Sequence, residues 1–193
     1  MRIRNDKRRI ITVVITAVII GISYLYADNT QVKNKHTEPT KATDLSSVHI
    51  VFTQVTVTRV VDGDTIVVEL LDGSSEKVRL IGINTPETVK PNSAVEHYGK
   101  EASNYTKSML SGKTIYLEKD VGDRDKYGRL LRYVWIEIPQ KINEQEIRQK
   151  MFNAILVIDG YAQLMTMPPD VKYANYFKKF QRDSRERNKG LWK

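Results

Sequence analysis

The sequence contains no cysteine among its 193 residues. This absence excludes a disulfide framework, a thiolate metal site and a cysteine nucleophile, and it leaves the cellular compartment open. Histidine is also scarce, with three residues, and neither an HNH-like nor an H-E-x-x-H pattern occurs. Metal-dependent hydrolysis through histidine ligands is therefore not supported.

Acidic residues are fewer than basic ones, 23 against 31, and the formal net charge is +8. Residues 1–48 carry eight basic and four acidic side chains, and residues 49–193 carry 23 and 19. The downstream region is thus only mildly basic, which suits an anionic partner but does not require one. The length fits one compact domain with accessory sequence, and the hydrophobic content of 40% can support a core.

A charge-free run from Ile10 to Ala27 follows a basic head that holds five basic residues within nine positions. As a helix this run spans roughly 27 Å, enough for a bilayer core. The basic head before it and Asp28 after it predict a cytoplasmic N-terminus with everything downstream outside the cytoplasm. The run is either a retained anchor or a cleaved signal peptide. The bulky Leu25 in the best cleavage pattern, Leu25-Tyr26-Ala27, favours the anchor.

Residues 28–48 are polar and contain almost no large apolar side chains. Such a stretch cannot bury enough surface to offset the entropy of ordering. We therefore expect a basic head and signal-anchor or signal-peptide segment at 1–27, with membrane contact through 10–27, a flexible tether at 28–48, and a folded domain at 49–193.

The folded domain shows strand-like alternation first and helical spacing later. Alternating valines from Val51 begin a three-stranded meander with turns at Asp62-Gly63 and Asp72-Gly73. The remaining strands are expected at Ile66–Leu70, Val78–Ile83, Thr114–Glu118 and Leu130–Ile138. Helical stripes occur at residues 94–109, 147–158 and 173–180. The pattern indicates an α+β fold, a five-stranded OB-type β-barrel with about three helices, preceded by an N-terminal hydrophobic helix.

Three short loops concentrate the side chains that could carry chemistry. The first, Asp62-Gly63-Asp64-Thr65, could be an ordinary hairpin turn, but its second aspartate exceeds what turn chemistry needs. The third, residues 123–129, places charged side chains around Gly128 and could be a solvated turn. Its Arg129 can nevertheless donate two parallel hydrogen bonds to a phosphate, and Tyr127 lies beside it.

The second loop runs from Arg79 to Glu87. Arg79 lies in an apolar strand, where burying a guanidinium is costly without an anionic partner. Pro86 favours an extended Thr85, so the Thr85 carbonyl, the Asn84 amide oxygen and the Glu87 carboxylate can face one point. These hard oxygen donors suit Ca²⁺ or Mg²⁺. A strand-ending turn with an exposed glutamate and a salt-bridged arginine is the alternative.

The motifs VVDGDTI, VRLIGINTPET and DKYGR resemble, in order and spacing, those of the thermonuclease (staphylococcal-nuclease-like) family. The segments YGKEAS, MFNAILVIDGYA and NKGLW also look like family segments, so the resemblance covers about residues 50–192. It implies a Ca²⁺-dependent endonuclease that hydrolyses DNA and RNA and leaves 3′-phosphate ends. No protein partner is implied.

The resemblance also implies roles for particular residues. The metal ligands would be Asp64, Asn84 and the Thr85 carbonyl. Glu87 would be the general base for the attacking water. The phosphate would be bound by Arg79 and Arg129, and the nucleotide by Tyr127 and Lys126. The family's best-studied members have aspartate in place of Asn84, and the asparagine, with one negative charge less, should weaken divalent-ion affinity.

A non-catalytic nucleic-acid-binding module of the OB type, tethered to the membrane, is the alternative function. Such barrels bind single strands through basic grooves and aromatic side chains without a metal. The carboxylates Asp64 and Glu87 argue against it, because carboxylates repel phosphates unless a cation intervenes.

Overall fold

The computed structural model describes residues 51–88 and 96–193. The hydrophobic run at 10–27 and the tether at 28–48 lie outside the described residues, so both stay predictions. Within the described ranges, no helix has the length and apolar character needed to cross a membrane.

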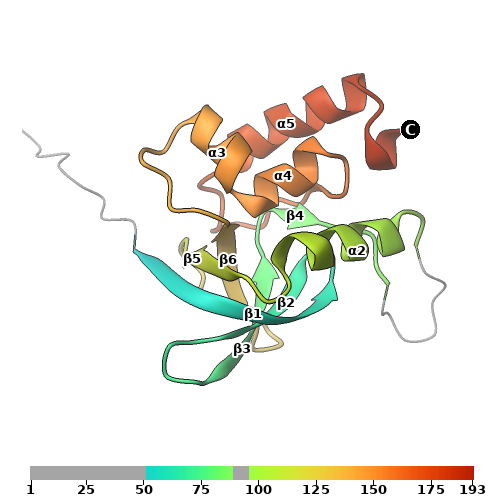
Figure 1. Ribbon diagram of the computed structural model, residues 1–193. Helices are drawn as coiled ribbons and strands as arrows, with labels where there is room; N and C mark the ends of the chain where they lie inside the picture. Colours follow the sequence, from blue (N-terminus) through green and yellow to red (C-terminus); the bar gives the residue numbers. More distant parts are fainter. Residues whose placement is uncertain (1–50, 89–95) are drawn as a thin grey trace, which may run out of the picture. The chain divides into compact units, whose positions relative to one another are not determined.

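Five strands close into a barrel in the order β1-β2-β3-β6-β5 (Figure 1). All neighbouring strands are antiparallel except β3 and β6, which run parallel. The barrel predicted from the alternating pattern is therefore confirmed, and β5 has the predicted bounds. The strands are β1 (Phe52–Asp62), β2 (Thr65–Glu69), β3 (Ser75–Leu80), β5 (Thr114–Glu118) and β6 (Leu130–Trp135).

Alternation places every second side chain of the first strands inside the barrel, because successive residues of a strand point to opposite faces. Val57, Ile66, Val68, Val78 and Leu80 are fully buried in one hydrophobic core. Burying such a side chain stabilises a fold by about 1.5–3 kcal/mol. The barrel thus gives the loops at its rim a rigid base.

Four α-helices and one short 3₁₀ helix are present in the described part of the chain. They are α2 (Gly99–Leu110), α3 (Glu144–Lys150), α4 (Phe152–Ile158), α5 (Ala174–Glu186) and η2 (Gly190–Trp192). In Figure 1, α2 lies beside the barrel, and α3, α4 and α5 gather above α2 and the barrel strands. The two-residue strands β4 (Ile83–Asn84) and β7 (Gln163–Leu164) pair with each other.

The predicted helix over 147–158 is wrong as a single element. Met151 is extended and forms a β-bridge with Trp135, so it divides the segment into α3 and α4. The predicted strand Leu130–Ile138 ends earlier for the same reason. Its Ile136 N–H turns to the Lys150 carbonyl at 2.8 Å.

The predicted strand Val78–Ile83 is also interrupted. Gly82 has a φ of +79°, and a Cβ there would lie 2.6 Å from the Phe177 ring, so this turn requires glycine. The first helix begins at Gly99 rather than at Ala94, which lies outside the described residues. Tyr98, predicted on the helical stripe, has a left-handed backbone with a φ of 67° and precedes the first turn.

Candidate active site

Asp64, in the turn between β1 and β2, joins the first predicted loop to the second. It is only 6% exposed. Its Oδ2 accepts a hydrogen bond from the Thr85 N–H at 2.9 Å and lies 3.0 Å from Arg79 Nη2. Two segments about 20 residues apart are therefore brought together, as the metal site predicted from the sequence requires.

Arg79 sits at the centre of this junction. Nη2 donates to Asn84 Oδ1 at 3.1 Å, and Nη1 donates to the Leu80 and Ile83 carbonyls. Burial lowers the pKa of Arg79, while the negative charge of Asp64 opposes that shift. The expected anionic partner of this buried guanidinium is thus Asp64.

Asp62 is a site residue that the sequence did not reveal. It is 5% exposed and accepts hydrogen bonds from the Gly63 N–H at 2.9 Å and the Thr88 hydroxyl at 2.7 Å. It thereby ties the end of β1 to the residue after Glu87. The paired aspartates of the first loop were the available signal, but turn chemistry accounts for one of them.

Glu87 is half-buried beside these carboxylates. Burial raises its pKa, and so do a hydrogen bond with Asp62 and the negative charges of Asp62, Asp64 and Glu96. Its own N–H donates to Glu96 Oε2 at 3.1 Å. Negative charge therefore accumulates around Glu87 in excess of the cations that face it.

Arg129 comes from the third loop and is held by Asp125. Nε donates to Asp125 Oδ2 at 2.6 Å, and Nη2 lies at the same distance from that oxygen. Burial works against ionisation of Asp125, but hydrogen bonds from Arg129 and Tyr127 hold its pKa below the ordinary value. Arg129 Nη1 lies 3.5 Å from Thr65 Oγ1, so the third loop approaches the first.

Tyr127 and Lys126 lie on the same loop as Arg129. The Tyr127 side chain is 71% exposed. Lys126 Nζ lies 5.0 Å and the Arg129 guanidinium carbon 5.5 Å from the centre of its ring. An aromatic face with two cations beside it is therefore open to solvent next to the site, as a nucleotide contact requires.

The residues at this junction fit a hard cation. Asp64, Asn84, Thr85 and Glu87 offer carboxylate, amide, carbonyl and hydroxyl oxygens, the donors that Ca²⁺ prefers. Thr85 Oγ1 is buried without a hydrogen-bond partner, and burial together with the charges of Asp62, Asp64 and Glu96 raises the pKa of Glu87. In the described segments no three histidines, cysteines or carboxylates group as a metal cluster, so a bound ion would depend on mixed donors.

The chain is similar to proteins of a known family. Residues 77–193 match the family model described as Staphylococcal nuclease homologue. Over 136 residues the chain is 43% identical to the thermonuclease of Staphylococcus intermedius, which covers 70% of this chain and 74% of that protein. It is 40% identical to the thermonuclease of Staphylococcus hyicus, with 70% and 73% covered. It is 34% identical to the endonuclease YncB of Bacillus subtilis, with 72% and 61% covered.

Proposed function

Because the chain belongs to the staphylococcal nuclease family, we propose that it is a Ca²⁺-dependent endonuclease that hydrolyses DNA and RNA and leaves 3′-phosphate ends. The observation that supports the proposal is the convergence of three loops. Arg79 lies 3.0 Å from Asp64, Arg129 approaches Thr65 at 3.5 Å, and the charge of Asp64 acts on Glu87. The names of the thermonuclease and endonuclease relatives support the same reaction.

The two arginines bind and polarise the scissile phosphate. Hydrolysis builds negative charge on the non-bridging oxygens, and fixed donors stabilise it where it develops. Asp125 fixes Nε and Nη2 of Arg129 and leaves Nη1 turned toward the first loop. Arg79 is fixed by backbone carbonyls within the second loop. Both guanidinium groups are thus oriented before substrate arrives, which lowers the cost of reorganisation.

Glu87 accepts a proton from the attacking water. A carboxylate with a raised pKa is a stronger base than an ordinary one, and the pKa of Glu87 is raised first by burial and then by the neighbouring Asp62 and Asp64. Asp64, Asn84 and the Thr85 carbonyl would hold the calcium ion. When bound, the ion supplies positive charge that offsets the phosphate and the carboxylates.

The proposed location is outside the cytoplasm. It rests on the basic head and the charge-free run at 10–27, which orient the folded domain outward whether the segment is retained or cleaved.

Digestion of plasmid DNA by the full-length protein tests the reaction. We expect cleavage with Ca²⁺, little with Mg²⁺, because Mg²⁺ demands stricter octahedral geometry, and none after chelation. The 3′ ends should support primer extension only after treatment with a phosphatase. Full activity in chelator, or strong activity with Zn²⁺ alone, would contradict the proposed site. Binding of DNA without cleavage under any condition would favour the OB-type binding module instead.

A further inference from the structure

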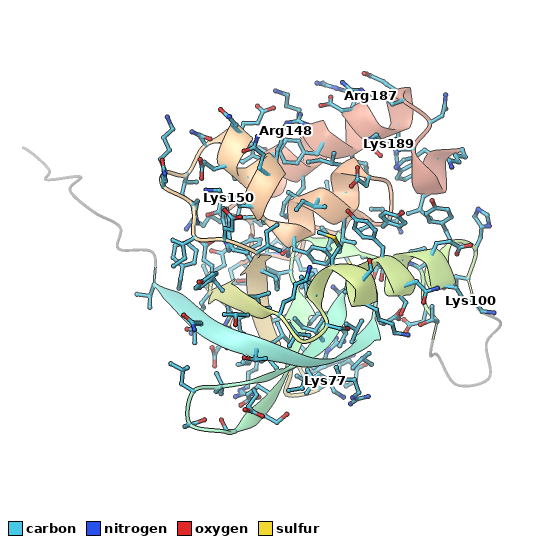
Figure 2. The ribbon with its side chains drawn as sticks, viewed as in Figure 1. Lys77, Lys100, Arg148, Lys150, Arg187 and Lys189 are labelled. Carbon is cyan, nitrogen blue, oxygen red and sulfur yellow. The ribbon has the colours of Figure 1, made fainter. Side chains whose placement is uncertain are left out.

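The positive charge of the folded domain is concentrated at its carboxyl end. Residues 174–193 carry seven basic and two acidic side chains, whereas residues 49–173 carry 16 and 17. The excess therefore lies entirely in α5 and the segment after it. Figure 2 shows Arg187 and Lys189 at the end of α5, with Arg148 on the neighbouring α3.

The outer side of α5 forms a shallow groove of about 370 Å³, which we call the α5 groove. Its opposite side buries Phe177 and Phe180, so the helix presents its polar side chains outward. The residues that line the groove are Asn175, Lys178, Lys179, Gln181, Arg182 and Arg185.

Most of the positive charge in the α5 groove has no strong acidic partner. Lys179 pairs with Glu144 at 2.8 Å, but Arg182 reaches Glu186 only at 3.9 Å. Lys178 and Arg185 form no ion pair with any residue that the structure describes. Exposed cations that repel one another on one helix face are typical of a surface that binds a polyanion.

The α5 groove connects to the candidate active site through the small β4–β7 sheet. Asn84 of the site pairs with Gln163 of β7, about 5 Å away for neighbouring strands. The next residue, Leu164, donates its N–H to Gln181 Oε1 at 2.6 Å, and Gln181 lines the groove. In Figure 1, β4 lies between the helices α4 and α5 and the barrel strands. The site and the groove are therefore linked through β4, β7 and Gln181.

We propose that the α5 groove binds the phosphate backbone of the substrate strand beyond the cleaved bond, so that the enzyme prefers long polynucleotides to short oligonucleotides. The proposal rests on the proposed nuclease function. The ammonium group of Lys178 and the guanidinium groups of Arg182 and Arg185 donate hydrogen bonds to successive phosphates and do not contact the bases.

An anionic lipid surface is the other polyanion that a basic helix can meet. Helices that lie in a membrane interface expose large apolar side chains next to their cations. None of the exposed large hydrophobic residues of the described chain lies in α5, and its phenylalanines are buried. The composition of this face therefore favours a nucleic acid.

The test compares two variants of the full-length protein from which the same number of charges has been removed. Lys178→Gln/Arg182→Gln alters the α5 groove, and Lys107→Gln/Lys113→Gln alters exposed lysines of α2 and the start of β5. Binding of labelled single-stranded DNA of about 30 and about four nucleotides is measured by fluorescence anisotropy in chelator, over a salt series.

For the groove variant, we expect the Kd of the long strand to rise by about tenfold. The slope of log K against log salt concentration should become shallower by about one to two. The short strand should bind as before, and the control pair should behave like the parent. An unchanged slope, or equal losses in both variants, would overturn the proposal. So would loss of binding to phosphatidylglycerol vesicles with binding of the long strand intact.

Calcium-dependent digestion by the parent separates this outcome from failure of the nuclease proposal. If the parent cleaves DNA and the groove variant has an unchanged salt slope, the nuclease proposal stands and the groove proposal is refuted. A parent that never cleaves, combined with a shallower slope in the groove variant, retains the groove as a nucleic-acid site and refutes the nuclease.

Discussion

At the candidate active site, Arg79 and Arg129 each lie against a carboxylate. On α5, by contrast, Lys178 is exposed and forms no ion pair in the described chain, and the Arg185 guanidinium carbon lies 4.2 Å from the centre of the Trp192 ring. Burial makes the first arrangement necessary, since an unpaired buried guanidinium would be costly. Exposure permits the second, because water and salt screen each cation. We infer two uses of positive charge in this molecule: Arg79 and Arg129 act as a fixed pair on one phosphate, and the exposed cations of α5 bind a polyanion.

The barrel and α5 are joined at Glu118, a buried residue at the end of β5. It is 1% exposed and accepts hydrogen bonds from Trp135 Nε1 at 2.7 Å and from the Tyr173 hydroxyl at 3.0 Å, and it pairs with Lys172. Trp135 belongs to the barrel, and Tyr173 immediately precedes α5. One carboxylate therefore joins the barrel to the helix that carries the basic groove.

The largest expected effect comes from breaking that junction with Glu118→Ala. The change leaves buried donors of Trp135 and Tyr173 without an acceptor, so the free energy of unfolding should fall by about 3–5 kcal/mol. Urea denaturation measures it. Glu69→Ala, at an exposed position of β2, is the control and should change little. A loss below about 1 kcal/mol in Glu118→Ala would show that other contacts hold α5 to the barrel.

The next effect separates catalysis from binding at the site. Glu87→Gln keeps the shape of the side chain but removes the proposed base, so cleavage of plasmid DNA should fall by about 10² or more. Binding of DNA in chelator should persist, because the arginines remain. Glu101→Gln on the exposed side of α2 serves as the control. Unchanged cleavage in Glu87→Gln would show that Glu87 is a turn residue without a role as the base.

The barrel and the three loops could be predicted from the sequence because both depend on local signals. Period-two alternation marks the strands, and the site residues lie in short motifs. The division at Met151 and the β4–β7 pair could not be predicted. A β-bridge to Trp135 and a strand of two residues are tertiary contacts that leave no periodic pattern.

The partners inside the site were missed for a similar reason. The requirement that Arg79 have an anion could be inferred from its apolar strand, but nothing local identifies that anion as Asp64, 15 positions earlier. Asp125 likewise reads as one charge among several in a mixed loop. Its role in orienting the loop is visible only in the structure, where Oδ1 accepts hydrogen bonds from the Tyr127 and Arg129 N–H groups and Oδ2 accepts one from Arg129 Nε.

A smaller effect is expected at the proposed metal ligands. Asn84→Asp adds a carboxylate beside Asp64 and Glu87, so calcium should bind more tightly and the concentration for half-maximal cleavage should fall by about tenfold. The rise in Tm on adding calcium, followed without substrate, gives a second readout. Asn104→Asp, on the exposed side of α2, controls for overall charge. An unchanged calcium requirement would remove Asn84 from the set of ligands.

The smallest effect concerns how α5 is fixed. The Arg148 guanidinium carbon of α3 lies 4.2 Å from the centre of the Phe180 ring, and the group donates to Glu144 at 2.9 Å and Asp183 at 2.7 Å. Arg148→Ala removes this stacking and packing, and should lower the free energy of unfolding by about 1 kcal/mol because the cluster is partly exposed. Arg187→Ala, an exposed position after α5, is the control in the same urea titration.

The pH dependence of stability identifies which part of that loss is electrostatic. Hydrogen bonds from Arg148 hold the pKa of Asp183 below its ordinary value, and those from Lys179 and Arg148 do the same for Glu144. A carboxylate with a depressed pKa stabilises the fold above the ordinary value of about 4, and that contribution is lost as the pH falls through the depressed pKa. The difference in unfolding free energy between the parent and Arg148→Ala should therefore shrink as the pH falls from about 6 to about 3. A difference that stays constant with pH would show that Arg148 holds α5 through its contact with Phe180 alone, and that the charges on this side of α5 contribute nothing to its position.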